Sequence, residues 1–141
     1  IMEYRRFGNT IYLRLDPKEE ILEEIGKVAK KENIRLAQVT GLGAINDFTA
    51  GVYNTVTKEY HSIQFQGAFE IVSLTGTVTR KDGDVYLHLH IAAGDEKGHV
   101  HGGHLNRAEV SATCEMVIRL IDGRIDRQYD EVTGLNLFKF L

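Results

Sequence analysis

Histidines are concentrated in one short stretch of this 141-residue chain, and imidazole is the commonest side-chain ligand for metals in proteins. Five of the six histidines fall between positions 88 and 104: His88, His90, His99, His101 and His104. Residues 85–91 alternate apolar and polar side chains, which predicts a strand with His88 and His90 on one face. Two imidazoles in that arrangement can reach a single ion.

A third ligand must come from the glycine-rich residues 98–104, which we interpret as a loop that folds back onto the strand. Spacing alone does not decide whether His99, His101 or His104 completes the site. A site of three histidines leaves one tetrahedral position open for water or substrate, as in catalytic zinc centres. We therefore predict a divalent metal cofactor, with zinc as the favoured ion and other imidazole-binding metals as the alternatives.

Two glutamates are candidates for moving a proton beside such an ion. Glu115 lies in residues 110–116, where alternation predicts that it shares a polar face opposite Cys114. Glu70 is predicted to share a face with Val72 and Leu74, and a carboxylate in so apolar a strand either pairs across an interface or belongs to a site. Tyr60 is expected to be an ordinary surface or interface residue.

Strands dominate the rest of the sequence. One helix is predicted to begin at Pro17, with Asp16 as its N-cap, Glu19 completing a capping box, and its end at Asn33. Strands are predicted at residues 3–7, 10–15, 34–40, 49–53, 59–65, 68–79, 84–92, 108–121, 124–130 and 135–140. Hairpin turns are predicted at residues 8–9, 81–83 and 122–123, and a bulge at the glycines of residues 41–44. The expected fold is α+β, a mostly antiparallel β-sheet or partial barrel with one main helix packed on it, in a single domain over residues 2–141.

Composition excludes several classes of protein. The chain is 43% hydrophobic and 26% charged, which is typical of a globular domain. Its 17 basic and 20 acidic residues give a net charge of −3, which argues against a strongly basic nucleic-acid binder. The single cysteine cannot form an intrachain disulfide, and no apolar run approaches the roughly 18 residues of a membrane span. We expect a cytoplasmic protein with no membrane partner.

Several stretches of the chain resemble the plants-and-prokaryotes conserved (PPC) domain, in its short prokaryotic form. They are residues 40–44, 51–53, 67–76, 88–90 and 102–105, in the order of the family. The resemblance implies a homotrimer of α+β subunits. It also implies a metal motif on His88, His90 and His104, with His99 and His101 outside it.

The resemblance also implies a DNA-associated or regulatory role, but two departures weaken that implication. Plant relatives carry an AT-hook with an Arg-Gly-Arg-Pro core, whereas the only proline of this chain is Pro17. Ala68 stands where plant members tend to have an arginine, so a positive charge is missing.

A more distant resemblance is to acetolactate decarboxylase, which is similar in its His-x-His pair, its later Gly-His and its use of three histidines on one zinc. It implies a second hypothesis, a metal-dependent lyase or hydrolase that acts on a small carbonyl or carboxylate compound. A third hypothesis is an oligomer whose metal ion is purely structural.

Overall fold

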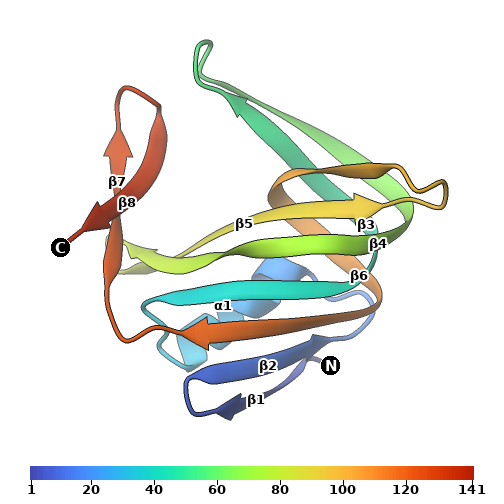
Figure 1. The fold of residues 1–141 in the computed structure, drawn as a ribbon, viewed down its shortest axis with the longest axis horizontal. Coiled ribbons are helices and arrows are strands. Elements are labelled where there is room, and N and C mark those ends of the chain that lie inside the picture. Colours follow the sequence, from blue (N-terminus) through green and yellow to red (C-terminus); the bar gives the residue numbers. More distant parts are fainter.

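The computed structural model describes residues 1–141 and confirms the α+β fold, with eight strands and one helix. The elements are β1 (Glu3–Phe7), β2 (Thr10–Leu15), α1 (Ile21–Lys31), β3 (Ala37–Asn54), β4 (Glu59–Lys81), β5 (Asp84–Gly94), β6 (Val100–Leu120), β7 (Ile125–Asp130) and β8 (Leu135–Phe140) (Figure 1). The single helix has 11 residues, about half of what a bilayer crossing needs.

The strands form one sheet in the order β1-β2-β6-β3-β4-β7-β8, and β5 pairs with both β4 and β6. Strands β3, β4, β5 and β6 therefore close a small antiparallel ring. Helix α1 packs against β5 and β6 and lies behind the sheet in Figure 1. A single cluster of 26 buried apolar residues fills the space between the helix and the strands.

The start of the helix differs from the sequence prediction. Glu20, not Asp16, is the N-cap, and its carboxylate accepts from the backbone N–H groups of Leu22 and Glu23 at 3.1 and 2.9 Å. Glu19 does accept from the backbone N–H of Asp16 at 2.7 Å, but this bond closes a turn. Lys18 has a φ of 77°, which a helix cannot contain, so helix formation is delayed until Ile21.

Three strands are longer than predicted. The predicted strand 49–53 and residues 37–40 of the predicted strand 34–40 are parts of β3, which begins only at Ala37. The bulges near Gly41 and Gly43 bend the chain without ending the pairing. The predicted strands 59–65 and 68–79 are likewise one strand, β4. Residues 100–104, expected in a loop, are the first residues of β6 and pair with β5.

The turns at residues 8–9 and 81–83 join hairpins as predicted, β1 to β2 and β4 to β5. The hairpin predicted at residues 122–123 is wrong. The last part of β6 already pairs with β2 on one edge and with β3 on the other, so β7 finds no free edge there. Instead β7 pairs with β8 and meets β4 at Arg80.

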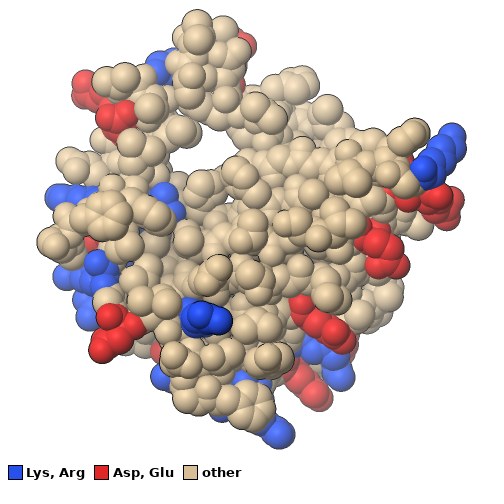
Figure 2. Space-filling view, viewed as in Figure 1, with Lys and Arg blue, Asp and Glu red and all other residues tan.

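Two extensions project from the body of the sheet. We call residues 52–61, where β3 and β4 pair with each other and with no other strand, the β3–β4 arm, and residues 125–140 the C-terminal hairpin. Their tips meet, because the Lys58 ammonium donates a hydrogen bond to the Val132 carbonyl. Figure 2 shows an opening between the two extensions and the rest of the molecule.

Candidate metal centre

Two strands bring three histidines together beside the β3–β4 arm. His88 and His90 lie two apart on β5, and His104 on β6 is the register partner of His90. The ring centroids are 5.1 Å apart for His88 and His90, 5.2 Å for His88 and His104, and 5.7 Å for His90 and His104. One ring nitrogen from each residue lies within 4.8 Å of the other two.

These three residues fit a metal ion by their chemistry. Tetrahedral zinc ligands at about 2.0–2.1 Å stand roughly 3.4 Å from one another, so small side-chain rotations bring three such nitrogens onto one ion. No aspartate, glutamate or cysteine of the chain joins this group, so the only protein ligands it offers are three imidazoles.

Strand alternation explains why His104 joins the site and the other two histidines of the stretch do not. The pairing of β5 with β6 is regular from His90–His104 to Gly94–Val100, so positions 101 and 104 lie on opposite faces. His101 is the partner of buried Ala93 and points to the core side. His101 therefore lies outside the group of three, and His99 lies before the first residue of β6 and does not join it either.

Glycines at 51 and 103 allow the backbone to pack closely next to His104. A Cβ on Gly103 would lie 2.6 Å from the Gly51 carbonyl oxygen, and Gly103 has a φ of 155°. Because a side chain at that position would collide with β3, glycine is required for His104 to sit against the arm.

Burial sets the protonation of the site. It lowers the pKa of His88 to about 4, assisted by the positive charges of His104, His90 and Arg127. Burial, then the charge of His90, also lowers the pKa of His104. Both rings are therefore neutral near pH 7, which is the form that binds metals.

Two residues beside the histidines were not identified from the sequence. Tyr60, expected as an ordinary surface or interface residue, comes from the arm with its ring edge-on to His104 at 5.9 Å. Its hydroxyl donates to Asn106 Oδ1 at 2.6 Å. Arg127, on β7, donates to Thr77 Oγ1, and Thr77 is the register partner of His88. The sequence feature that points to Arg127 is its place in the middle of the predicted strand 124–130. Alternation puts it on the same face of that strand as Ile125.

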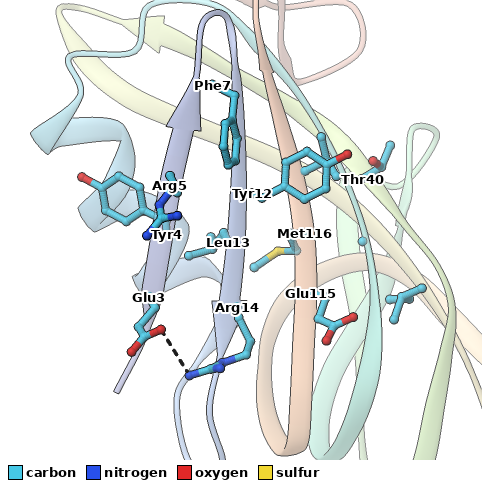
Figure 3. A pocket seen from close by; sticks show the side chains of 13 residues that line it. Glu3, Tyr4, Arg5, Phe7, Tyr12, Leu13, Arg14, Thr40, Glu115 and Met116 are labelled. Carbon is cyan, nitrogen blue, oxygen red and sulfur yellow. Dashed lines mark ion pairs between the residues drawn. The ribbon is translucent and has the colours of Figure 1, made fainter.

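The two glutamates named as proton-transfer candidates lie elsewhere on the sheet. Glu115 is exposed and pairs in register with Leu42 and Arg14. It lines a groove of about 790 Å³ over β1, β2, β6 and β3 (Figure 3). There Arg14 turns towards Glu3, 3.6 Å away, and not towards Glu115.

Glu70 is also exposed, and its strand does not have the predicted face. A bulge between Ile71 and Ser73 reverses the alternation, so Leu74 is buried while Glu70 and Val72 face outwards. The prediction that Glu70 shares a face with Leu74 is therefore wrong.

Comparisons with known proteins agree with this fold. The sequence pattern of the Plants and Prokaryotes Conserved (PCC) domain matches residues 2–122. A Bacteroides thetaiotaomicron structure, named a candidate DNA-binding protein, is 32% identical with a TM-score of 0.96, covering 99% of this chain and 97% of that one. A metal-containing protein of Archaeoglobus fulgidus is 33% identical over 99% of both chains, with a TM-score of 0.87. A plant- and prokaryote-conserved protein of Pyrococcus horikoshii is 33% identical, with a TM-score of 0.85 over 100% of this chain and 96% of that one.

Two further similarities are more distant, and each covers less than two thirds of the matched protein. Acetolactate decarboxylase of Bacillus subtilis shares the fold at 16% identity and a TM-score of 0.58, over 86% of this chain and 57% of that enzyme. The bifunctional protein GlmU of a Synechococcus strain is 29% identical over 125 residues, and the match spans 19% of its length. The match over residues 2–122 and the likeness to whole structures establish that this chain belongs to the plants-and-prokaryotes conserved domain family.

Proposed function

We propose that this protein binds one divalent metal ion, zinc first, through His88, His90 and His104. The observation that carries the proposal is the convergence of three ring nitrogens within 4.8 Å with no acidic residue among them. The name of the Archaeoglobus fulgidus relative as a metal-containing protein supports it.

The metal content of single variants tests this proposal. Replacing His88, His90 or His104 by alanine removes one of three ligands, so we expect each variant to lose stoichiometric zinc on dialysis. His101→Ala is the matched control, because it lies three residues from His104 on the opposite face. Full zinc retention in all three variants would contradict the site. Loss in His101→Ala but not in His104→Ala would move the third ligand.

The centre suits catalysis as well as binding, and we propose a small carbonyl or carboxylate compound as the class of ligand. Three histidines leave an open coordination position, where a bound ion polarises a carbonyl oxygen or lowers the pKa of water. Tyr60, which is edge-on to His104, and Arg127, which donates to the register partner of His88, are polar side chains next to the three histidines. Glu115 and Glu70 are still proposed for proton transfer. Because both lie away from the three histidines of their own chain, this role requires another subunit to bring them near the metal centre. Four protein ligands around the ion in a crystal would make the site structural.

We propose that the active assembly is a homotrimer, as the family resemblance implies. Large apolar side chains are exposed on one chain, including Leu42 at 57%, Tyr12 at 58% and Val72 at 62%. Exposed apolar area of this kind is typical of a subunit interface. Light scattering at micromolar concentration should give three times the subunit mass, and a monomer would contradict the proposal.

A DNA-associated role is the second candidate function, and the name of the Bacteroides relative is what supports it. The charge of this chain favours weak binding at most, because the net charge is −3. On the face in Figure 2, Lys and Arg side chains are interspersed with Asp and Glu. We expect no mobility shift of duplex DNA at submicromolar protein. A shift that weakens steeply with salt would favour the DNA role.

A further inference from the structure

Arg127 is a buried guanidinium with no acidic partner. It is only 9% exposed, and none of the ion pairs of the chain includes it. Its acceptors are all neutral: Thr79 Oγ1 at 3.0 Å, the Asn136 carbonyl at 3.1 Å and Thr77 Oγ1 at 3.3 Å. A guanidinium has five N–H donors, so these three bonds leave two of them free.

Aromatic rings hold this side chain in place. The guanidinium carbon lies 4.8 Å from the centre of the Tyr86 ring and 4.4 Å from the centre of the Phe138 ring. Burial lowers the pKa of Arg127, but an arginine in a protein stays protonated. The result is a fixed positive charge with unused donors, already desolvated before any ligand arrives.

This charge lies next to the candidate metal centre. Thr77, which accepts from Arg127, is the register partner of His88 on the neighbouring strand. A divalent ion on the three histidines would therefore stand beside a guanidinium. No carboxylate joins the three histidines, and none is paired with Arg127. Uncompensated like charges in a half-buried site are costly, so the loaded site favours an anion.

We propose that Arg127 anchors the carboxylate of a small ligand that binds at the metal ion. This inference rests on the proposed metal centre and names the ligand class for it. The planar fork of an arginine matches a carboxylate in a bidentate fashion, and it also accepts phosphate. Arg127 lies on the C-terminal hairpin, outside the residues 2–122 that match the family pattern. The hairpin thus supplies selectivity to a centre built by the strands of the family domain.

The visible absorption of the cobalt-loaded protein is the readout, because it reports ligands near the ion without any activity. Acetate, its neutral isostere acetamide and inorganic phosphate are titrated against the natural protein and against Arg127→Met, Arg127→Lys and Arg124→Gln. The last variant is the matched control, since Arg124 is an exposed arginine near the same hairpin, paired with Asp126 at 3.0 Å.

We expect acetate to change the spectrum of the natural protein at lower concentration than phosphate, and acetamide to have no effect. Arg127→Met should bind acetate about 10- to 100-fold more weakly, as expected for a lost charge-assisted hydrogen bond. Arg127→Lys should be intermediate and Arg124→Gln unchanged. If Arg127→Met does not fold, Arg127→Lys decides, because it keeps the charge and loses the fork.

Cobalt content is measured first, so the two proposals fail in different ways. A natural protein that takes up no cobalt contradicts the metal centre and, with it, the ligand class. Cobalt-loaded protein that ignores acetate, or binds it equally in the natural and Arg127 variants, overturns the role of Arg127 alone. Tighter binding of phosphate than of acetate overturns the assignment to carboxylates.

Discussion

The same pair of strands carries two groups of histidines, and their surroundings differ. His88, His90 and His104 face the side flanked by the arm and the C-terminal hairpin, with no acidic residue in their group. His101 faces the other side, where its Nε2 lies 3.0 Å from Asp95 Oδ2 and its ring lies 5.0 Å from that of Phe65. The first group offers ring nitrogens that no acidic residue occupies, whereas the hydrogen bond to Asp95 already occupies a ring nitrogen of His101. Alternation along β6 therefore places His104 and His101, two residues of the same type, in different surroundings.

The largest effect on this arrangement is expected from Gly103. In Gly103→Ala the new Cβ would lie 2.6 Å from the Gly51 carbonyl oxygen, at a φ of 155°. Strain and overpacking together should lower the free energy of unfolding by about 2–5 kcal/mol and displace His104 from the metal group. Urea unfolding and zinc content measure the two consequences.

Gly98→Ala is the matched control for that substitution. Gly98 also has a positive φ, 82°, but no atom lies within 4 Å of a Cβ built on it. We expect a loss of about 1 kcal/mol and full zinc content. Equal losses in the two variants would show that close packing at Gly103 does not position His104.

A smaller effect is expected from acid on the metal-free protein. His88 has a pKa of about 4 in the folded state, below the usual 6.5, mainly because it is buried. Between those values the unfolded chain binds the proton more readily, so stability falls as the pH drops from about 6.5 to 4. Allowing for solvent screening, the loss attributable to His88 is about 1–2 kcal/mol. The measurement is denaturant unfolding across this range, and a His88→Asn variant with the same pH slope would contradict it.

The smallest effect is expected from Asp95, on the other face of the strands. Its carboxylate accepts from the backbone N–H groups of Lys97 and His99, both at 2.9 Å, and pairs with His101. Asp95→Asn should lower Tm slightly and leave zinc content unchanged. Loss of zinc in this variant would show that the two groups of histidines are coupled.

The sequence predicted the helix, the mainly antiparallel sheet and the His88–His90 pair, because these depend on short-range periodicity. Spacing did not single out His104 among the histidines of residues 98–104, since these residues look like a glycine-rich loop when they are read without their β5 partner. Once Val100–Leu120 is a strand, alternation alone separates His104 from His101. The family resemblance had assigned the same three residues.

The position of Arg127 could not be predicted in the same way. It depends on β7 failing to pair with β6, because both edges at the end of β6 are occupied by β2 and β3. The bulge that turns Glu70 away from Leu74 is a similar case, since a one-residue irregularity reverses every later side chain. Contacts between distant segments decide both features, and local patterns do not record them.

Crystallographic anomalous scattering from zinc-loaded protein tests the central claim most directly. We predict one strong peak about 2.0–2.1 Å from one ring nitrogen of each of His88, His90 and His104, with an open fourth position towards Arg127. A peak at Asp95 and His101, with none among the three histidines, would contradict it.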